Sequence, residues 1–154
     1  MSKETSAGAV VFRRENSKIY YLLLHYEAGH WDFPKGHIEK DEKEEDTVKR
    51  EVTEETGIED IKIIEGFKEW IKYFYRKTYD LNEDEKKKAS WIFKIVTFYL
   101  AETKTKEVKI SFEHIDYKWL PYEQAFGQLT FKNAKEILKK AHHYPAKRGV
   151  RASQ

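Results

Sequence analysis

The sequence has no cysteine in its 154 residues, so neither a disulfide bond nor a thiolate metal site can form. It also has no apolar run long enough to span a membrane, and no apolar stretch of the signal-peptide type near its N-terminus. We therefore expect a soluble, cytoplasmic protein that enters no membrane and has no obligate protein partner.

The chain carries little net charge, because its 29 basic and 27 acidic residues leave a formal charge of +2. These charges are nevertheless segregated. Residues 36–58 hold nine acidic and four basic side chains, whereas residues 132–151 hold seven basic and one acidic side chain. Gathered acids suggest a cation site and gathered bases an anionic substrate, although a solvated surface is the more common origin of any single charge run.

The composition predicts one globular domain. Hydrophobic residues make up 40% of the chain and charged residues 36%, and this length suffices to bury a core. Neither an internal repeat nor a linker interrupts the sequence. We expect a single domain over residues 1–154, with its core over about residues 5–144 and a flexible basic tail over residues 145–154.

The first half of the chain reads as two strands and a helix. Runs rich in β-branched and aromatic residues, at 7–13 and 19–26, flank a polar turn and should pair as strands. A helix is expected from about Glu42 to Thr56, with Asp41 as its N-cap and Gly57 at its C-terminal end.

The other elements follow from composition and spacing. Residues 90–101 are apolar on both faces and should form a central strand. The remaining expectations are a loop at 29–36, strand character over 61–75, a charged and mobile loop over 76–89, a short strand over 115–120 and a closing helix over about 131–141. Together they predict one α+β domain with a mixed sheet between helices.

The predicted helix is too acidic to be explained by core packing, because its only aliphatic side chains are Val48 and Val52. Three glutamates stand at i, i+3 and i+4 and so share one face: Glu51, Glu54 and Glu55. Like charges at these spacings repel and cost about a few tenths of a kcal/mol per pair. Clustered carboxylates are the ligands of hard divalent cations such as Mg²⁺ or Mn²⁺, which would relieve that repulsion.

Spacing alone leaves a second interpretation open, a solvent-facing helix with i, i+4 ion pairs such as Arg50–Glu54. The surrounding sequence distinguishes the two. Nine positions over 23 residues follow the order G-x5-E-x7-R-E-U-x-E-E-x-G-U, where U is a bulky aliphatic residue. They are Gly36, Glu42, Arg50, Glu51, Val52, Glu54, Glu55, Gly57 and Ile58. This order resembles the Nudix box at every specified position.

The resemblance implies the Nudix fold, an α/β/α sandwich, and metal-dependent hydrolysis of a nucleoside diphosphate linked to another moiety. The metal-binding residues that it implies are Gly36, Glu51, Glu54 and Glu55. Among them Glu54 is our candidate for the general base, which takes the proton of the attacking water. Glu42 and Arg50 are implied as an ion pair that braces the loop–helix–loop around the site.

A wider resemblance, over about residues 8–144, points to the asymmetric diadenosine tetraphosphate hydrolases. It rests on the segments Trp31–His37, Ile63–Lys68, Tyr99–Glu102, Phe112–Leu120 and Phe131–Lys132. It implies that diadenosine tetraphosphate is cleaved to ATP and AMP. The segment 76–89 is longer than we expect for this family.

The same resemblance implies further site residues outside the box. Glu113 would add a glutamate to the catalytic and metal site, although it could be an ordinary loop acid. Lys94 interrupts an apolar run and must reach solvent or an anion, for which the family implies a phosphate. The other implied phosphate contacts are Tyr26, His30 and Lys35, and the implied adenine sandwich is Tyr73 and Phe131. Aromatic residues make up 15% of the chain, so packing is the more common role of any one of them.

Three other functions stay open from the sequence. Pyrophosphate could be removed from the 5′ end of RNA, a substrate to which the basic segment 132–151 is suited. Diphosphoinositol polyphosphates would require basic side chains but no stacking aromatics. RNA binding or scaffolding without catalysis is disfavoured, because none of the box glutamates is missing.

Overall fold

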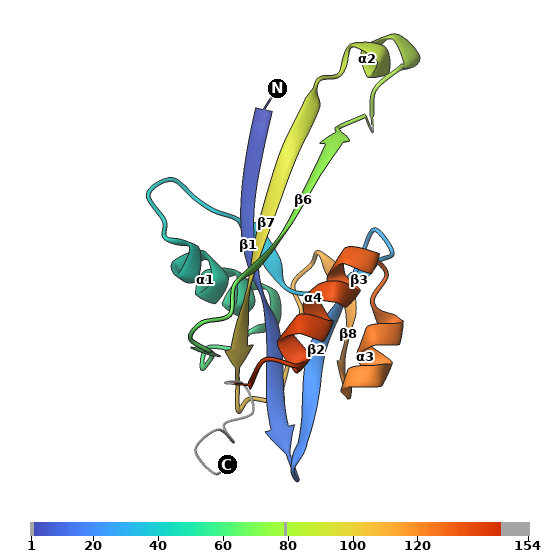
Figure 1. Cartoon of the computed structure of the whole chain (residues 1–154). Coiled ribbons are helices and arrows are strands. Elements are labelled where there is room, and N and C mark those ends of the chain that lie inside the picture. Colours follow the sequence, from blue (N-terminus) through green and yellow to red (C-terminus); the bar gives the residue numbers. More distant parts are fainter. Residues whose placement is uncertain (1, 79, 146–154) are drawn as a thin grey trace.

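A mixed eight-stranded sheet forms the centre of the computed structural model, which describes residues 2–78 and 80–145 (Figure 1). Its longest strands, β1 (Ser2–Glu15) and β7 (Trp91–Glu102), lie side by side and run parallel. The other pairings are antiparallel. They add β2 (Lys18–Tyr26), β3 (Trp31–Asp32), β4 (Lys35–His37), β5 (Lys62–Ile63), β6 (Glu69–Arg76) and β8 (His114–Leu120).

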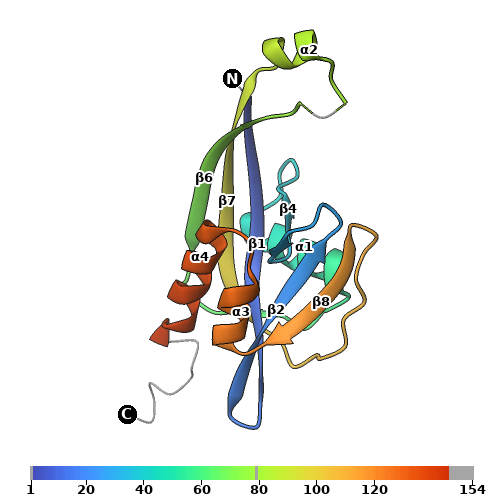
Figure 2. The same ribbon diagram turned by 90° about the vertical axis from the view of Figure 1, so that its right-hand side faces the viewer.

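Helices cover the sheet on both sides. Helix α1 (Glu44–Thr56) lies on one face, and α3 (Tyr122–Gln128) and α4 (Lys132–His142) lie on the other (Figures 1 and 2). The predicted α/β/α sandwich with a mixed sheet is therefore confirmed. No helix among the described residues is long and apolar enough to cross a membrane.

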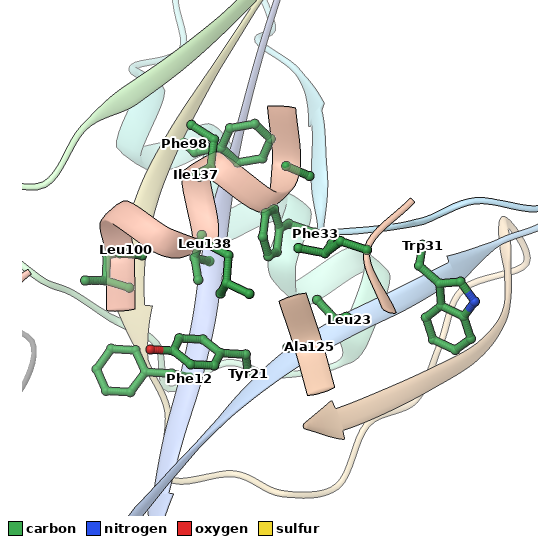
Figure 3. Close-up of a cluster of buried hydrophobic side chains, with 14 of the residues drawn as sticks. Phe12, Tyr21, Leu23, Trp31, Phe33, Phe98, Leu100, Ala125, Ile137 and Leu138 are labelled. Atoms are coloured by element: carbon green, nitrogen blue, oxygen red, sulfur yellow. The ribbon is translucent and has the colours of Figure 1, made fainter. Parts of the chain in front are cut away.

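Each face of the sheet has its own core, because side chains along a strand alternate between the faces. In β1, Ala7, Ala9 and Val11 pack under α1, where they meet Val48 and Val52. On the opposite face α3 and α4 close a larger, aromatic core (Figure 3), whose fully buried side chains include Phe12, Tyr21, Phe33, Phe98 and Leu138. The central position predicted for residues 90–101 is confirmed by β7.

The start of α1 differs from the expectation. Asp41 has a φ of 65° and belongs to the preceding turn, so it is not the N-cap. Lys43 occupies that position and makes no side-chain capping hydrogen bond. The acidic residues before the helix suggested a cap, but one of them, Glu42, forms an ion pair with Arg50 instead. At the other end Gly57, with a φ of 76°, ends the helix as predicted.

Three loop assignments need correction. The predicted loop 29–36 includes β3 and most of β4, which are too short to show a periodicity. The segment 76–89 was expected to be a mobile loop, yet Asn82 and Glu85 form a capping box that starts α2 (Glu83–Lys88). Sequence analysis also missed α3, and the expected strand at 61–75 is divided into β5 and β6.

The outer part of β6 and the first part of β7 form an arm that projects beyond both helical layers, with α2 at its end (Figures 1 and 2). The beginning of β1 runs along the arm, since Ser2 is aligned with Ile92. The basic tail predicted for residues 145–154 lies, after Pro145, outside the described residues.

We expect Leu138→Ala to destabilise the protein by about 2–5 kcal/mol, because Leu138 is fully buried in the aromatic core and truncation leaves a cavity. Chemical denaturation monitored by circular dichroism measures this change. Glu136→Ala is the matched control, since Glu136 is exposed on the same helix and should change the free energy of unfolding by less than about 0.5 kcal/mol. Equal losses in the two variants would contradict this core assignment.

Candidate active site

Helix α1 turns two glutamates into the body of the protein and leaves a third exposed to solvent. Glu51 and Glu55 are one helical turn apart and are only 8% and 5% exposed. They share the buried side of α1 with Val48 and Val52. The side chain of Glu54 is 56% exposed. The i, i+4 spacing thus buries two carboxylates where a packing helix would place apolar side chains.

The carboxylate of Glu51 lies against Gly36 of β4. A Cβ atom at position 36 would overlap both oxygens of Glu51, so this approach requires glycine. Arg50 Nη1 lies 3.5 Å from Glu51 Oε1. The other oxygen, Oε2, is buried and has no hydrogen-bond partner among the described residues. A buried carboxylate oxygen in this state is costly unless a ligand satisfies it.

Glu55 is held at one oxygen by the backbone. Its Oε1 accepts a hydrogen bond of 3.1 Å from the N–H of Lys35, and its Oε2 lies 3.9 Å from His114 Nε2. Burial, followed by repulsion from Glu51, raises the pKa of Glu55 to about 8. Burial, followed by repulsion from Glu54, raises the pKa of Glu51 to about 7. Burial is the main cause of both shifts, and the nearby cations Arg50 and Lys35 offset it only in part.

A cavity of about 380 Å³ opens in front of these carboxylates. Its lining includes Tyr26, Lys35, Gly36, Arg50, Glu51, Glu55, Lys94 and Glu113. Within residues 2–78 and 80–145, no three carboxylate or histidine side chains converge tightly enough to enclose an ion, because the acids are spread around the cavity wall. Their chemistry fits a hard divalent cation, since they combine oxygen ligands, an unpaired buried oxygen and raised pKa values.

Arg50 ties this helix to the loop before it. Its Nε and Nη2 donate to the two carboxylate oxygens of Glu42 at 2.8 and 3.0 Å. Nη2 also donates to the backbone carbonyl of His37 at 3.0 Å, and Nη1 lies 3.3 Å from Glu54. The hydrogen bonds from Arg50 and Thr47 lower the pKa of Glu42 to about 2. The predicted Glu42–Arg50 ion pair is therefore present, and it is bidentate.

A second cavity of about 540 Å³ adjoins the first, and Lys35 lines both. The second cavity brings together His30, Tyr73 and Phe131, which come from distant parts of the sequence. Tyr73 and Phe131 are 40% and 48% exposed, so neither ring is buried in the core. Aliphatic and aromatic side chains of β6 and β7 form its floor, namely Ile71, Val96 and Phe98.

Tyr26 and His30 belong to a column of rings that runs between the two cavities. His30 lies 5.2 Å from Phe131 and stacks on Tyr26 at 4.6 Å, and Tyr26 meets the edge of His114 at 4.4 Å. The Tyr26 hydroxyl donates to the Phe33 carbonyl at 2.7 Å. Tyr26 was predicted to contact phosphate, and the structure places its ring at the cavity while its hydroxyl bonds to the backbone.

Two lysine side chains line the carboxylate cavity in addition to Arg50. The side chain of Lys94 is only 15% exposed, and burial followed by repulsion from Lys35 lowers the pKa of Lys94. Its Nζ lies 4.0 Å from Glu4, and Lys35 Nζ lies 3.7 Å from Asp32. These partners are too distant for strong hydrogen bonds, so both ammonium groups can still take an anion.

Two residues of the site were not predicted from the sequence, namely Asp32 and His114. Asp32 is 6% exposed and lines the aromatic cavity, and His114 is buried beside Glu55. Asp32 lies within the segment Trp31–His37, and His114 directly follows Glu113. Both the segment and Glu113 were singled out in the sequence. No periodicity or spacing distinguished them from ordinary loop residues.

Comparison with known proteins identifies the class. The model of the NUDIX domain family matches residues 3–142. The chain therefore belongs to the Nudix family, and α1 is the helix within the box-like segment 36–58. It is a Nudix hydrolase, a class of enzymes that generally use divalent metal ions.

The relatives fall into two groups. The chain is 36% identical to the asymmetrical bis(5′-nucleosyl)-tetraphosphatase of Mus musculus, over 90% of this chain and 93% of that protein. It is 33% identical to an RNA pyrophosphohydrolase of Nitratiruptor, over 77% and 76% of the two chains. Among solved structures, a binary complex of the C. elegans Ap4A hydrolase superposes with a TM-score of 0.76 at 29% identity, covering 94% of this chain and 98% of that one.

We expect the metal-free protein to lose stability as the pH rises from the ordinary glutamate pKa of about 4.5 to the folded pKa of Glu55 of about 8. The range from about pH 6.5 to about pH 8, above the ordinary histidine pKa, is the one to measure. An acid whose pKa is raised by folding binds more protons in the folded state, so stability falls as pH rises toward the folded value. Glu51 and Glu55, with pKa values of about 7 and about 8, act in this window.

Melting temperatures measured in the presence of a chelator test this expectation. The double variant Glu51→Gln/Glu55→Gln should melt at least as high as the wild type at about pH 8.5, and its melting temperature should depend less on pH. Glu45→Gln, on the exposed side of α1, is the control and should keep the wild-type slope. An equal pH dependence in all three proteins would show that these carboxylates do not titrate as described.

Proposed function

We propose that this enzyme hydrolyses diadenosine tetraphosphate asymmetrically to ATP and AMP, with Mg²⁺ or Mn²⁺ as its metal. The observation that carries the proposal is the pair of adjoining cavities that share Lys35. One is apolar and aromatic and suits a nucleobase, and the other is lined by carboxylates and lysines and suits a polyphosphate with its cation. The tetraphosphatase relatives, matched over 90% of this chain, support this choice of substrate.

The aromatic cavity would bind one adenosine. Tyr73 and Phe131 would stack on the base, and their exposed rings make room for it without moving core side chains. Lys35 lies where the two cavities meet, so it would bind the first phosphates beyond that nucleoside. Lys94, on the wall of the carboxylate cavity, would bind phosphate oxygens nearer to the point of cleavage, and His30 would border the same path.

Glu51, Glu55 and Glu113 would hold the cation at the wall of the carboxylate cavity, and Gly36 gives the Glu51 carboxylate the space to do so. Glu54, which the sequence also implied as a ligand, is exposed and does not line that cavity in the structure. The bound cation supplies neutralisation of phosphate charge and makes a nearby water more acidic. Glu54 would accept the proton of the attacking water as the general base. Its exposed side chain would pass that proton to solvent, and Arg50 at 3.3 Å steadies its carboxylate.

Removal of pyrophosphate from the 5′ end of RNA is the second candidate. The RNA pyrophosphohydrolase relatives favour it, and a 5′-triphosphate next to a base would occupy the same two cavities. Diphosphoinositol polyphosphates would leave the aromatic cavity unused. Binding of RNA without catalysis is disfavoured by the complete set of box glutamates. The cytoplasmic location expected from the sequence stays a prediction.

We expect Glu54→Gln to lower kcat at least ~100-fold, because a general base typically contributes 10²–10⁴-fold. The exposed Arg50–Glu54 pair stabilises the fold by less than about 1 kcal/mol, so the variant should remain folded. Steady-state rates at saturating Mg²⁺, with circular dichroism of each protein, measure both effects. Glu45→Gln is the control on the same helix and should keep the wild-type kcat. A kcat within about threefold of wild type would exclude Glu54 as the base.

The position of cleavage tests the substrate assignment. If one adenosine is held in the aromatic cavity at a fixed distance from the cation, the cut is counted from that end. Diadenosine tetraphosphate should then give ATP and AMP, and the pentaphosphate should give ATP and ADP. Product analysis in ¹⁸O-labelled water identifies the phosphorus that is attacked. The panel should include 5′-triphosphorylated RNA and an inositol pyrophosphate, compared by kcat/KM.

Two outcomes would change the assignment. Formation of two ADP molecules from the tetraphosphate would contradict asymmetric cleavage and leave the Nudix hydrolase assignment intact. A higher kcat/KM for triphosphorylated RNA than for any dinucleotide would favour the RNA pyrophosphohydrolase.

A further inference from the structure

His114 is a buried histidine with one nitrogen aimed at the acidic helix. It begins β8 directly after Glu113, and its side chain has no exposed surface. Its Nε2 faces Glu55 Oε2 at 3.9 Å and has no hydrogen-bond partner among the described residues. His114 does not itself line the carboxylate cavity, although its neighbours Glu55 and Tyr26 do.

The protonation of the His114 ring follows from its two neighbours. Nδ1 lies 3.0 Å from the hydroxyl oxygen of Ser111, which can either donate or accept. Glu55 must be a carboxylate to bind a cation, and a carboxylate can only accept. The nitrogen that faces it therefore has to carry the hydrogen, and the Ser111 hydroxyl then donates to Nδ1. Of the two neutral tautomers, only the one with hydrogen on Nε2 satisfies both neighbours.

The segment 111–114 is fixed to the end of α1, so His114 is aligned with Glu55 by the backbone. The N–H of Ser111 donates to the carbonyl of Glu55 at 3.3 Å, and the N–H of His114 donates to the carbonyl of Ser111 at 3.1 Å. The ring of Tyr26 packs against the His114 ring at 4.4 Å, which prevents His114 from turning away. The donor and the carboxylate are thus attached to one rigid unit.

We propose that His114 is a positioning residue that orients Glu55 for cation binding through an Nε2–H to Oε2 hydrogen bond. The two atoms need to approach by about 1 Å to reach hydrogen-bond distance. Lys35 N–H already holds the other oxygen of Glu55, so His114 supplies the second constraint on the same carboxylate. Carboxylates that bind metals are commonly oriented by such partners. The inference rests on the proposed metal-dependent function.

The tautomer can be measured without any turnover. In protein labelled with ¹⁵N-histidine and saturated with Mg²⁺, long-range ¹H–¹⁵N correlation spectra distinguish hydrogen on Nε2 from hydrogen on Nδ1. The His114 signals are assigned by their absence from His114→Gln. We expect Nε2–H with an unprotonated Nδ1. Hydrogen on Nδ1 alone, or an Nε2 signal showing direct coordination of the metal, would overturn the proposal.

A matched pair of variants tests the hydrogen bond itself. A glutamine side chain can place an N–H near the position of Nε2, whereas asparagine reaches only as far as Nδ1. We expect His114→Asn to weaken Mn²⁺ binding by about 10–100-fold, as loss of such partners typically does, and His114→Gln to recover most of this affinity. Titration calorimetry of Mn²⁺ alone gives both dissociation constants. In turnover, kcat should fall in His114→Asn while KM for the nucleotide changes little.

The outcomes separate this proposal from the assignment of substrate. Wild-type affinity for Mn²⁺ in His114→Asn, or equal losses in both variants, would overturn the positioning role. Neither result depends on which phosphoanhydride is cleaved. If His114→Asn does not fold, as judged by circular dichroism, the tautomer measured in the wild type still decides the question.

Discussion

The burial of two carboxylates on one helix is the constraint on which the rest of the site depends. Glu51 and Glu55 occupy positions of α1 where a packing helix would carry apolar side chains, and their pKa values of about 7 and about 8 record the cost of charging them there. Most groups around them either reduce that cost or make room for it. The Lys35 N–H and Arg50 supply positive charge, and the missing side chain of Gly36 supplies space. In the proposed function, a divalent cation would supply the charge that these groups do not.

The fold holds an acidic helix in place with few apolar contacts of its own. Val48 and Val52 anchor α1 to β1, and that anchoring is modest for a helix of 13 residues. Arg50 compensates by joining the helix to the preceding loop through Glu42 and the His37 carbonyl. Because β4 carries Gly36 and pairs with β1, the loop and the helix are both fixed to the central strand. The carboxylates can therefore repel one another without displacing the helix.

Sequence patterns predicted what depends on local periodicity and missed what depends on a turn or on tertiary contact. The strands around residues 7–13 and 90–101 and the closing helix are confirmed, because each buries a face whose apolar spacing shows in the sequence. Asp41 was wrongly assigned as the N-cap, since an acid before a helix can equally belong to a turn with a positive φ. The capping box of α2 was overlooked within a charged segment. His114 and Asp32 went unnoticed because their burial arises only when β2, β3 and β8 pair.

The column of rings gives a physical reason for a fixed cleavage position. Phe131, His30, Tyr26 and His114 contact one another in succession, and the last of them faces Glu55. The first borders the aromatic cavity, while the last is fixed to the end of α1. Rings packed at such distances cannot shorten or lengthen the column without breaking contacts on both sides. In the proposed function, the protein would therefore set the separation between a base stacked on Phe131 and the carboxylates that hold the cation, and with it the number of phosphates between base and cut.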